Sequence, residues 1–244
     1  MIGQTVIFDG HRLNDRFFVG DVSCGLPEFV PRAHERVGDG SHVGGMRVGT
    51  ATIAVTLVAK PVRGEPTRAA ISALLSWLDV EGPRRLSLSE DGGLWRMAVP
   101  NGAPEVVDIE YNDVITVEFM QTEPWLYGSE RSVTIPSGGN ARFLVGGDAP
   151  TMPTVSAASV TRDDGTLRWG VRLDGGDVLR VGIPVASASS VLIDCPSRKC
   201  SVNGATTAIS LESDWLVLKP GTHVIQNDLG AGACEVAWLE RWHR

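Results

Sequence analysis

The chain has 244 residues, a length typical of one large domain or two small ones. Its 29 acidic residues outnumber its 22 basic residues and give a formal net charge of −7, which argues against a surface that coats nucleic acid. The 28 glycines and 14 prolines favour turns over long helices, and a hydrophobic share of 43% is sufficient for packed cores.

The first residues carry neither the basic segment nor the apolar segment of a secretory signal. The longest mostly apolar stretch, residues 51–59, is too short and too rich in threonine to cross a bilayer. We therefore expect a protein made in the cytoplasm that does not insert into a membrane.

Residues 31–49 form an unusual segment that is rich in glycine, arginine and histidine and poor in apolar side chains. Such a segment cannot bury itself well. The sequence leaves two interpretations open: a mobile surface loop, or an arm that is ordered only against another subunit.

Residues 50–57 alternate apolar and polar side chains, which predicts a strand with one buried face. The next segment, residues 66–78, has the spacing of a helix instead. Pro66 suits a first helical turn, and Gly82 with Pro83 stops any continuation. The apolar residues that set this helical spacing are Ile71, Leu74, Leu75 and Leu78.

The remaining periodic segments all predict strands, at residues 115–119, 167–173 and 234–238. Seven Asp-Gly or Asn-Gly pairs favour tight hairpin turns, since both residues accept positive φ. The pairs begin at Asp9, Asp39, Asp91, Asn101, Asp164, Asp174 and Asn203. About ten short strands after a boundary near residues 122–132 predict a β-sandwich of the jelly-roll type.

The four cysteines allow three interpretations. Cys195 and Cys200 have the spacing C-x4-C, and Cys24 and Cys234 are isolated. Buried apolar thiols, a local disulfide between Cys195 and Cys200, and a metal site all remain open, although no histidine lies near enough in sequence to complete a zinc site.

Motifs of enzymatic chemistry are missing. The chain has no phosphate-binding loop, no dinucleotide-binding glycine pattern, no H-E-x-x-H and no G-x-S-x-G. We therefore predict neither an enzyme nor a bound cofactor or metal. Of the seven tryptophans, Trp169, Trp215 and Trp238 lie in strand-like segments and are expected in a core, whereas an exposed tryptophan would suit sugar stacking.

The order of several short motifs resembles the distal tail protein (Dit) family of long-tailed, siphovirus-type phages and prophages. The opening Ile7-Phe8-Asp9-Gly10 is similar to the start of that family, and Glu123-Pro124-Trp125-Leu126-Tyr127-Gly128 is similar to its mid-chain junction. His223 stands where the family commonly has asparagine. The other matching segments are residues 14–15, 18–22, 47–57, 74–78, 146–155, 192–194, 202–204 and 218–225.

This resemblance implies a mainly β fold with two β-sandwich domains. Residues 1–128 would form the ring-forming domain, with a single α-helix at 66–78 and a hairpin arm at 31–49. Residues 129–244 would form a galectin-like, jelly-roll domain. The resemblance favours the arm interpretation, and the candidate subunit-contact residues are Arg32, Arg36, His42 and Arg47.

The function that the resemblance implies is structural. Proteins of this kind form a homo-hexameric ring at the distal end of the tail tube and join it to the baseplate or tail-fibre hub. The expected partners are other copies, the tail tube protein and the hub protein, and the expected location is the virion tail. The alternative is a carbohydrate-binding module that attaches to host cell-wall carbohydrate; neither function involves specific binding of nucleic acid.

Overall fold

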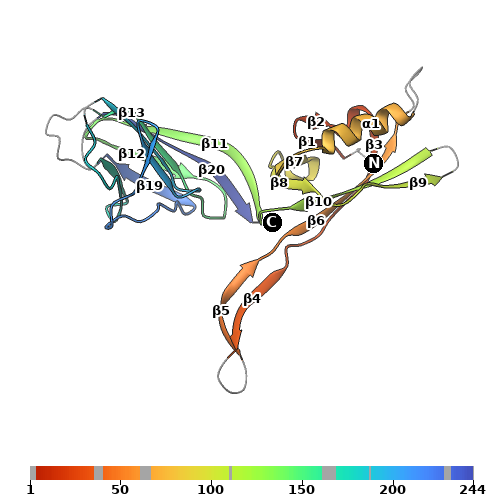
Figure 1. Ribbon diagram of the computed structural model, residues 1–244, viewed down its shortest axis with the longest axis horizontal. Helices are drawn as coiled ribbons and strands as arrows, with labels where there is room; N and C mark the ends of the chain where they lie inside the picture. Colours follow the sequence, from red (N-terminus) through yellow and green to blue (C-terminus); the bar gives the residue numbers. More distant parts are fainter. Residues whose placement is uncertain are drawn as a thin grey trace. The chain divides into compact units, whose positions relative to one another are not determined.

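The computed structural model describes residues 4–35, 41–60, 67–109, 112–160, 169–186, 188–227 and 232–243. The chain is mainly β, as predicted, and divides into two compact units, Met1–Leu126 and Tyr127–His243 (Figure 1). Within the described ranges, no helix is both long enough and apolar enough to span a membrane.

The N-terminal unit holds ten strands, one α-helix and two short 3₁₀ helices among its described residues. In chain order they are β1 (Val6–Phe8), β2 (His11–Arg12), η1 (Leu13–Asp15), β3 (Phe17–Cys24), β4 (Phe29–Glu35), β5 (Ser41–Val48), β6 (Ala51–Ala59), α1 (Thr67–Leu78), β7 (Arg84–Leu88), η2 (Ser89–Asp91), β8 (Arg96–Pro100), β9 (Glu105–Ile109) and β10 (Asn112–Gln121). Eight of these strands form one antiparallel sheet in the order β2-β1-β7-β8-β10-β6-β3, and β9 also pairs with β10. Strands β4 and β5 form a separate two-stranded sheet.

Strand β6 lies inside the eight-stranded sheet and confirms the strand predicted at residues 50–57. Its residues Ile53, Val55 and Leu57 are completely buried, and the residues between them are not. One face of the sheet therefore forms the core of this unit, as the alternation predicts.

Helix α1 covers this core face (Figure 1). Ala70 and Leu74 are buried in the same cluster as the inward residues of β6 and β10. The predicted helix at residues 66–78 is thus confirmed for Thr67–Leu78, and Pro66 lies outside the described residues.

Three of the predicted Asp-Gly and Asn-Gly turns close hairpins with positive φ at both residues. Asp9, Asp174 and Asn203 have φ of 47°, 49° and 51°, and the glycines that follow have φ of 81°, 74° and 78°. Asp9 and Asn203 begin two-residue loops, for which a type I′ turn requires positive φ at both residues. Asp174 begins a three-residue loop, since Leu173 pairs with Asp177. Asp39 and Asp164 lie outside the described residues.

The C-terminal unit is a β-sandwich of two sheets. Its described strands are β11 (Trp125–Ile135), β12 (Asn140–Val145), β13 (Thr154–Val160), β14 (Gly170–Leu173), β15 (Asp177–Arg180), β16 (Ser189–Asp194), β17 (Lys199–Val202), β18 (Ala205–Thr207), β19 (Gly221–Gln226) and β20 (Cys234–His243). The six-stranded sheet has the order β11-β20-β13-β16-β17-β18, and the four-stranded sheet has the order β12-β19-β14-β15.

Side chains from both sheets meet in one core. Trp169 and Trp238 are buried there, and Trp215 packs against it partly buried, so all three tryptophans expected in a core contribute to one. The ring of Phe143, on the four-stranded sheet, lies 4.8 Å from that of Trp238, on the six-stranded sheet. The two sheets of this unit therefore bury these apolar side chains against each other.

The cysteines are free thiols, which supports the first of the three interpretations. Cys200 pairs with Ile193 in the β16–β17 ladder, so Cys195 lies two residues beyond, at a diagonal position that a disulfide does not readily span. Burial raises the pKa of the Cys195 thiol to about 11 and that of Cys234 to about 12. No group of three His, Cys, Asp or Glu side chains that could hold a metal ion occurs among the described residues.

Candidate subunit-contact site

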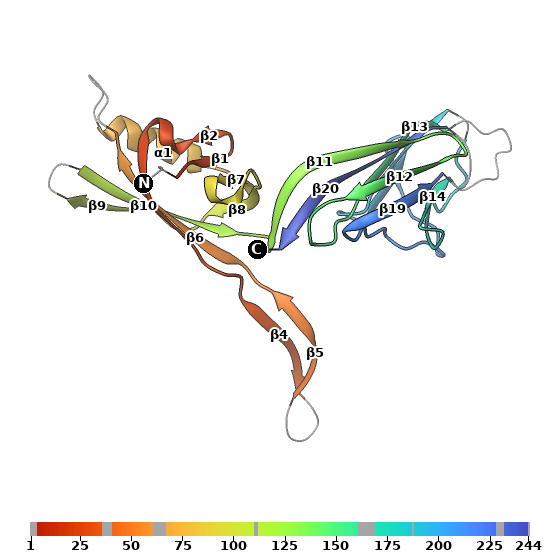
Figure 2. The ribbon, with the colours of Figure 1, turned by 180° about the vertical axis from the view of Figure 1, so that it is seen from behind.

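The most unusual element of the N-terminal unit is the ribbon formed by β4 and β5. The two strands pair with each other in a sheet of their own. Both views show this ribbon leaving the eight-stranded sheet at the point where β3 ends and β6 begins (Figures 1 and 2). Within the segment predicted as an arm, residues 31–35 and 41–48 lie on this ribbon, whose first strand starts two residues earlier at Phe29. Residues 36–40 lie outside the described residues. We call residues 29–48 the arm.

The arm has two chemically different faces. Phe29 is paired with Val48, and Pro31 with Met46, so these four side chains share one face. Phe29 is 65% exposed and Met46 58% exposed, although both are large and apolar. The described residues therefore leave most of Phe29 and Met46 uncovered.

The opposite face of the arm is basic. Val30 is paired with Arg47, and alternation along β4 places Arg32 on the same face. Both arginines are exposed. The structure therefore brings together two of the four predicted contact residues, and it places them away from the apolar face.

The other two predicted contact residues are less fully described. His42 lies in β5 opposite His34, and only the pairing of its backbone is described. Arg36 lies outside the described residues. Their role as contact residues stays a prediction.

A second uncovered apolar surface crosses the eight-stranded sheet on the face opposite α1. The strand registers place Phe18 beside Val58, Val58 beside Val114, and Val114 beside Val107. Phe18 is 57% exposed and Val107 45% exposed, and the two residues between them are half-buried. We call Phe18, Val58, Val114 and Val107 the apolar row.

Sequence reasoning missed the apolar row because its members come from four separate strands. Phe18 is in β3 and Val107 in β9, some ninety positions apart in the chain. Only the register of the sheet aligns them. The strands predicted at residues 50–57 and 115–119 stop one residue short of Val58 and Val114, and their second faces carry threonine, alanine and glutamate, so they gave no signal for the row.

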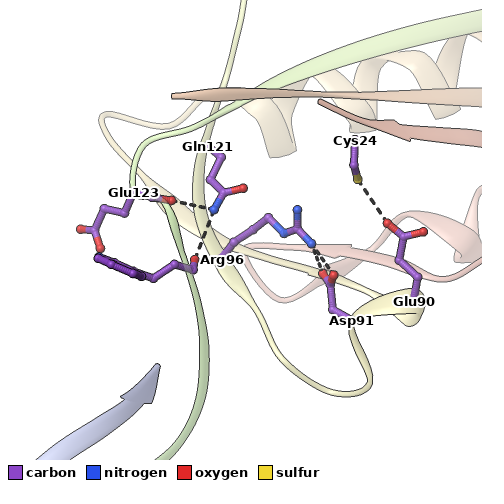
Figure 3. Close-up of polar contacts among 7 residues, drawn as sticks. Cys24, Glu90, Asp91, Arg96, Gln121 and Glu123 are labelled. Carbon is purple, nitrogen blue, oxygen red and sulfur yellow. Dashed lines mark hydrogen bonds and ion pairs between the residues drawn. The ribbon is translucent and has the colours of Figure 1, made fainter. Parts of the chain in front are cut away.

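A buried polar cluster lies at the end of β10, where the chain leaves the N-terminal unit (Figure 3). Arg96 is completely buried and forms an ion pair with Asp91, whose side chain is 8% exposed. Nearby, the Cys24 thiol donates to Glu90 Oε1 over 3.2 Å. A buried arginine requires such a partner, and nothing in the sequence around Arg96 indicates that it is buried.

Gln121 in this cluster fixes the segment that follows β10. Its amide Nε2 donates to the backbone carbonyls of Glu123, over 2.6 Å, and Trp125, over 3.2 Å (Figure 3). The backbone amide of Thr122 donates to the carbonyl of Met97 over 3.0 Å. The cluster therefore orders the junction.

The C-terminal unit shows no aromatic surface of the kind that binds sugars. All aromatic side chains of residues 127–243 fall within the described ranges, and each of them is buried or half-buried. One apolar cavity of about 400 Å³ is lined by Gly182, Ile183 and residues 208–212. It contains a single carboxylate, that of Glu212, so it lacks the pair of facing acids that glycoside hydrolysis uses.

His223, which stands where the family commonly has asparagine, contacts one side chain and one backbone carbonyl. Its Nδ1 lies 2.6 Å from Asp174 Oδ2, and its Nε2 lies 2.7 Å from the carbonyl of Lys219. Burial by itself raises the pKa of Asp174, but the hydrogen bond from the Val224 amide and the bond and charge of His223 outweigh it, so the pKa is lowered. The pair fastens the β14–β15 turn to β19.

Comparison with known proteins agrees with this architecture. Residues 146–242 match the family model described as the siphovirus-type tail component, C-terminal domain. The search of curated proteins found no match.

Solved structures match over nearly the whole chain. The crystal structure of the Dit protein of phage SPP1, described as a paradigm of the hub adsorption apparatus of phages infecting Gram-positive bacteria, has a TM-score of 0.74 at 18% identity and covers 98% of each chain. A chain of the phage P2 baseplate in its activated conformation with Ca has a TM-score of 0.55 at 10% identity and also covers 98% of each chain. The same baseplate with Sr matches with a TM-score of 0.54 at 9% identity over 98% and 97% of the two chains.

The family model accounts for most of the C-terminal unit, and the fold of the Dit protein accounts for both units in one chain. This is the mainly β fold with a single helix that the motifs in the sequence led us to expect. Residues 146–242 thus match the siphovirus-type tail component, C-terminal domain, and the whole chain has the fold of the Dit protein of phage SPP1.

Proposed function

We propose that this protein forms a homo-hexameric ring at the distal end of a phage tail tube and joins the tube to the baseplate or tail-fibre hub. The family and the fold are those of a structural component of the virion tail. In this proposal residues 1–128 form the ring, and residues 129–244 face outward as a second, non-catalytic domain. The tail tube protein and the hub protein are its partners on either side.

The observation that carries this proposal is the arm. A two-stranded hairpin without a third strand or a helix against it is marginally stable in water. The arm nevertheless exposes Phe29 and Met46, whereas the rest of the N-terminal unit closes a core of its own. Another subunit would supply the surface that the arm lacks, and a contact between two different surfaces of the same chain builds rings.

The experiment that tests the ring is a measurement of the mass of the purified chain in solution by multi-angle light scattering. A ring has six times the mass of the 26.1 kDa chain. Replacing residues 29–48 with a short Gly-Ser turn should leave the circular-dichroism spectrum of a β protein and yield only monomers. A chain that is monomeric at every concentration, or a deletion variant that still forms the full ring, would contradict the proposal.

A further inference from the structure

We propose that the apolar cavity of the C-terminal unit is a docking site for another protein, which places an apolar side chain in the cavity and basic side chains beside Glu212. The cavity has a volume of about 400 Å³ and is lined by Gly182, Ile183 and residues 208–212. We call the cavity and these lining residues the edge pocket. The inference goes beyond the proposed ring and does not depend on it, because it concerns only residues of the C-terminal unit.

The edge pocket lies where the outermost strands of the two sheets approach each other. Strand β15 is at one end of the four-stranded sheet, and β18 is at one end of the six-stranded sheet. Val181, which directly follows β15, bridges to Ile209, two residues beyond the end of β18. The other end of the six-stranded sheet is β11, through which the chain enters this unit. The pocket is therefore at the edge of that sheet opposite its entry strand.

Hydrogen bonds fix the backbone on both sides of the pocket. The amide of Gly182 donates to the carbonyl of Ala208 over 2.8 Å, and the amide of Ser210 donates to the carbonyl of Arg180 over 2.9 Å. Position 182 also has no room for a side chain, because an added Cβ would lie 2.8 Å from the carbonyl oxygen of Ala208. The pocket is thus preformed, and a partner that binds there loses little free energy to ordering it.

The apolar side chains of the pocket are unusually exposed. Leu211 is completely exposed and Ile183 is 45% exposed, although both line the same cavity. Contiguous exposed apolar side chains of this kind mark interaction sites on soluble proteins. A leucine that projects completely into water is covered only by a surface with a hollow of its own. A protein offers such a surface, whereas a small molecule inside the cavity would leave Leu211 in water.

The charges around the pocket define the chemistry of the partner. Strand β15 and residues 208–216 together contain the acidic residues Asp177, Glu212 and Asp214 and a single basic residue, Arg180. Basic side chains on the partner complement this acidic edge. None of the seven residues that line the pocket is basic or aromatic, so the pocket lacks the groups that bind phosphate or stack on sugar rings. The occupant is therefore an apolar and basic protein segment.

The first experiment measures the binding of a short fluorescein-labelled peptide to the full chain by fluorescence polarisation. The peptide carries two leucines between an arginine and a lysine in a Gly-Ser background. One comparison peptide replaces the leucines with serine, and the other replaces the basic residues with glutamate. We expect the basic, leucine-containing peptide to bind at least about tenfold more tightly than either comparison peptide, and to bind more weakly as the salt concentration rises. Equal binding of the three peptides, or binding of none, contradicts the proposal.

Substitutions of exposed side chains locate the binding. The double variant Ile183→Ser, Leu211→Ser should lower the affinity for the basic peptide at least about tenfold and leave the chain folded, because both side chains are already largely in water. The matched control Leu144→Ser, Leu192→Ser removes two exposed leucines elsewhere in the same unit and should bind normally. Glu212→Lys should reverse the preference, so that the acidic peptide binds more tightly than the basic one.

The outcomes separate this inference from the proposed function. Peptide binding at the edge pocket of a chain that never forms a ring supports the inference and contradicts the proposed function. A ring that binds no peptide, or that binds it equally well in the double variant and in the control, leaves the proposed function intact and overturns the inference. A photoreactive p-benzoylphenylalanine at position 211 that cross-links to an isotope-labelled second copy without any peptide assigns the pocket to a contact between copies and also overturns the inference.

Discussion

The arm and the C-terminal sandwich are made of the same kind of strand, yet their apolar side chains have different surroundings. In the sandwich, Trp169 is 1% exposed, because side chains from two facing sheets meet around it. In the arm, Phe29 is 65% exposed, because no second layer covers the ribbon. The difference teaches that alternation in a sequence determines which side chains share a face. It does not determine what covers that face, and another subunit can provide the cover.

The largest expected difference in stability between the two regions appears when one aromatic side chain is removed from each. Trp169→Ala should lower the free energy of unfolding of the C-terminal unit by about 3–5 kcal/mol, because it leaves a cavity in a closed core. Phe29→Ala should change the stability of the free chain by less than about 0.5 kcal/mol, since its ring is already in water. Urea unfolding followed by far-ultraviolet circular dichroism measures both values. Equal losses for the two variants would show that the arm packs against its own chain.

An intermediate effect is expected at a turn of the sandwich. Asn203 has φ of 51°, and its Oδ1 accepts a hydrogen bond of 2.8 Å from the amide of Ser190. Asn203→Ala should cost about 1–3 kcal/mol, because alanine loses this bond and is strained at positive φ. Asn203→Asp keeps the acceptor and should cost less. Arg47→Ala in the arm is the comparison, and it should leave the urea midpoint of the monomer unchanged.

The smallest effect is a dependence on pH that only the sandwich should show. The pKa of Asp174 is lowered in the folded protein, so the unfolded chain binds more protons there as the pH falls. The stabilisation from Asp174 is therefore complete above its ordinary pKa, near 3.8, and is lost as the pH falls through the lower folded value. Urea midpoints between pH 2 and pH 7 should show a shallower acid decline for Asp174→Asn than for the wild type. Identical slopes would contradict the role of Asp174 in fastening its turn.

Much of the fold could be predicted from the sequence because it depends on local chemistry. The alternation in residues 50–57 corresponds to β6, the helical spacing to α1, and Asp9, Asp174 and Asn203 to hairpin turns. These features need only side-chain period and tolerance of positive φ. The unusual composition of residues 31–49 likewise marks the segment that forms the arm.

The candidate site could be predicted only in part, because its geometry depends on register. The role of the listed arginines and histidines in subunit contact stays a prediction, and the list did not reveal that Phe29 and Met46 share the opposite face. The apolar row joins four strands whose order does not follow the chain. Arg96 is another example: its burial beside Asp91 follows from tertiary packing, and an arginine in a strand is ordinarily exposed.

The separation of the arm from the sheet also has a consequence for the timing of tail assembly. In the proposed ring, a two-stranded ribbon gains its cover only on the surface that receives it, so each early encounter between two copies should be short-lived. In this proposal every incomplete ring leaves one arm uncovered, whereas the closed ring covers them all. Assembly should therefore begin slowly in free solution and proceed quickly on a tube end that holds the first copies in place, so that the growing tail itself sets the moment at which the ring appears.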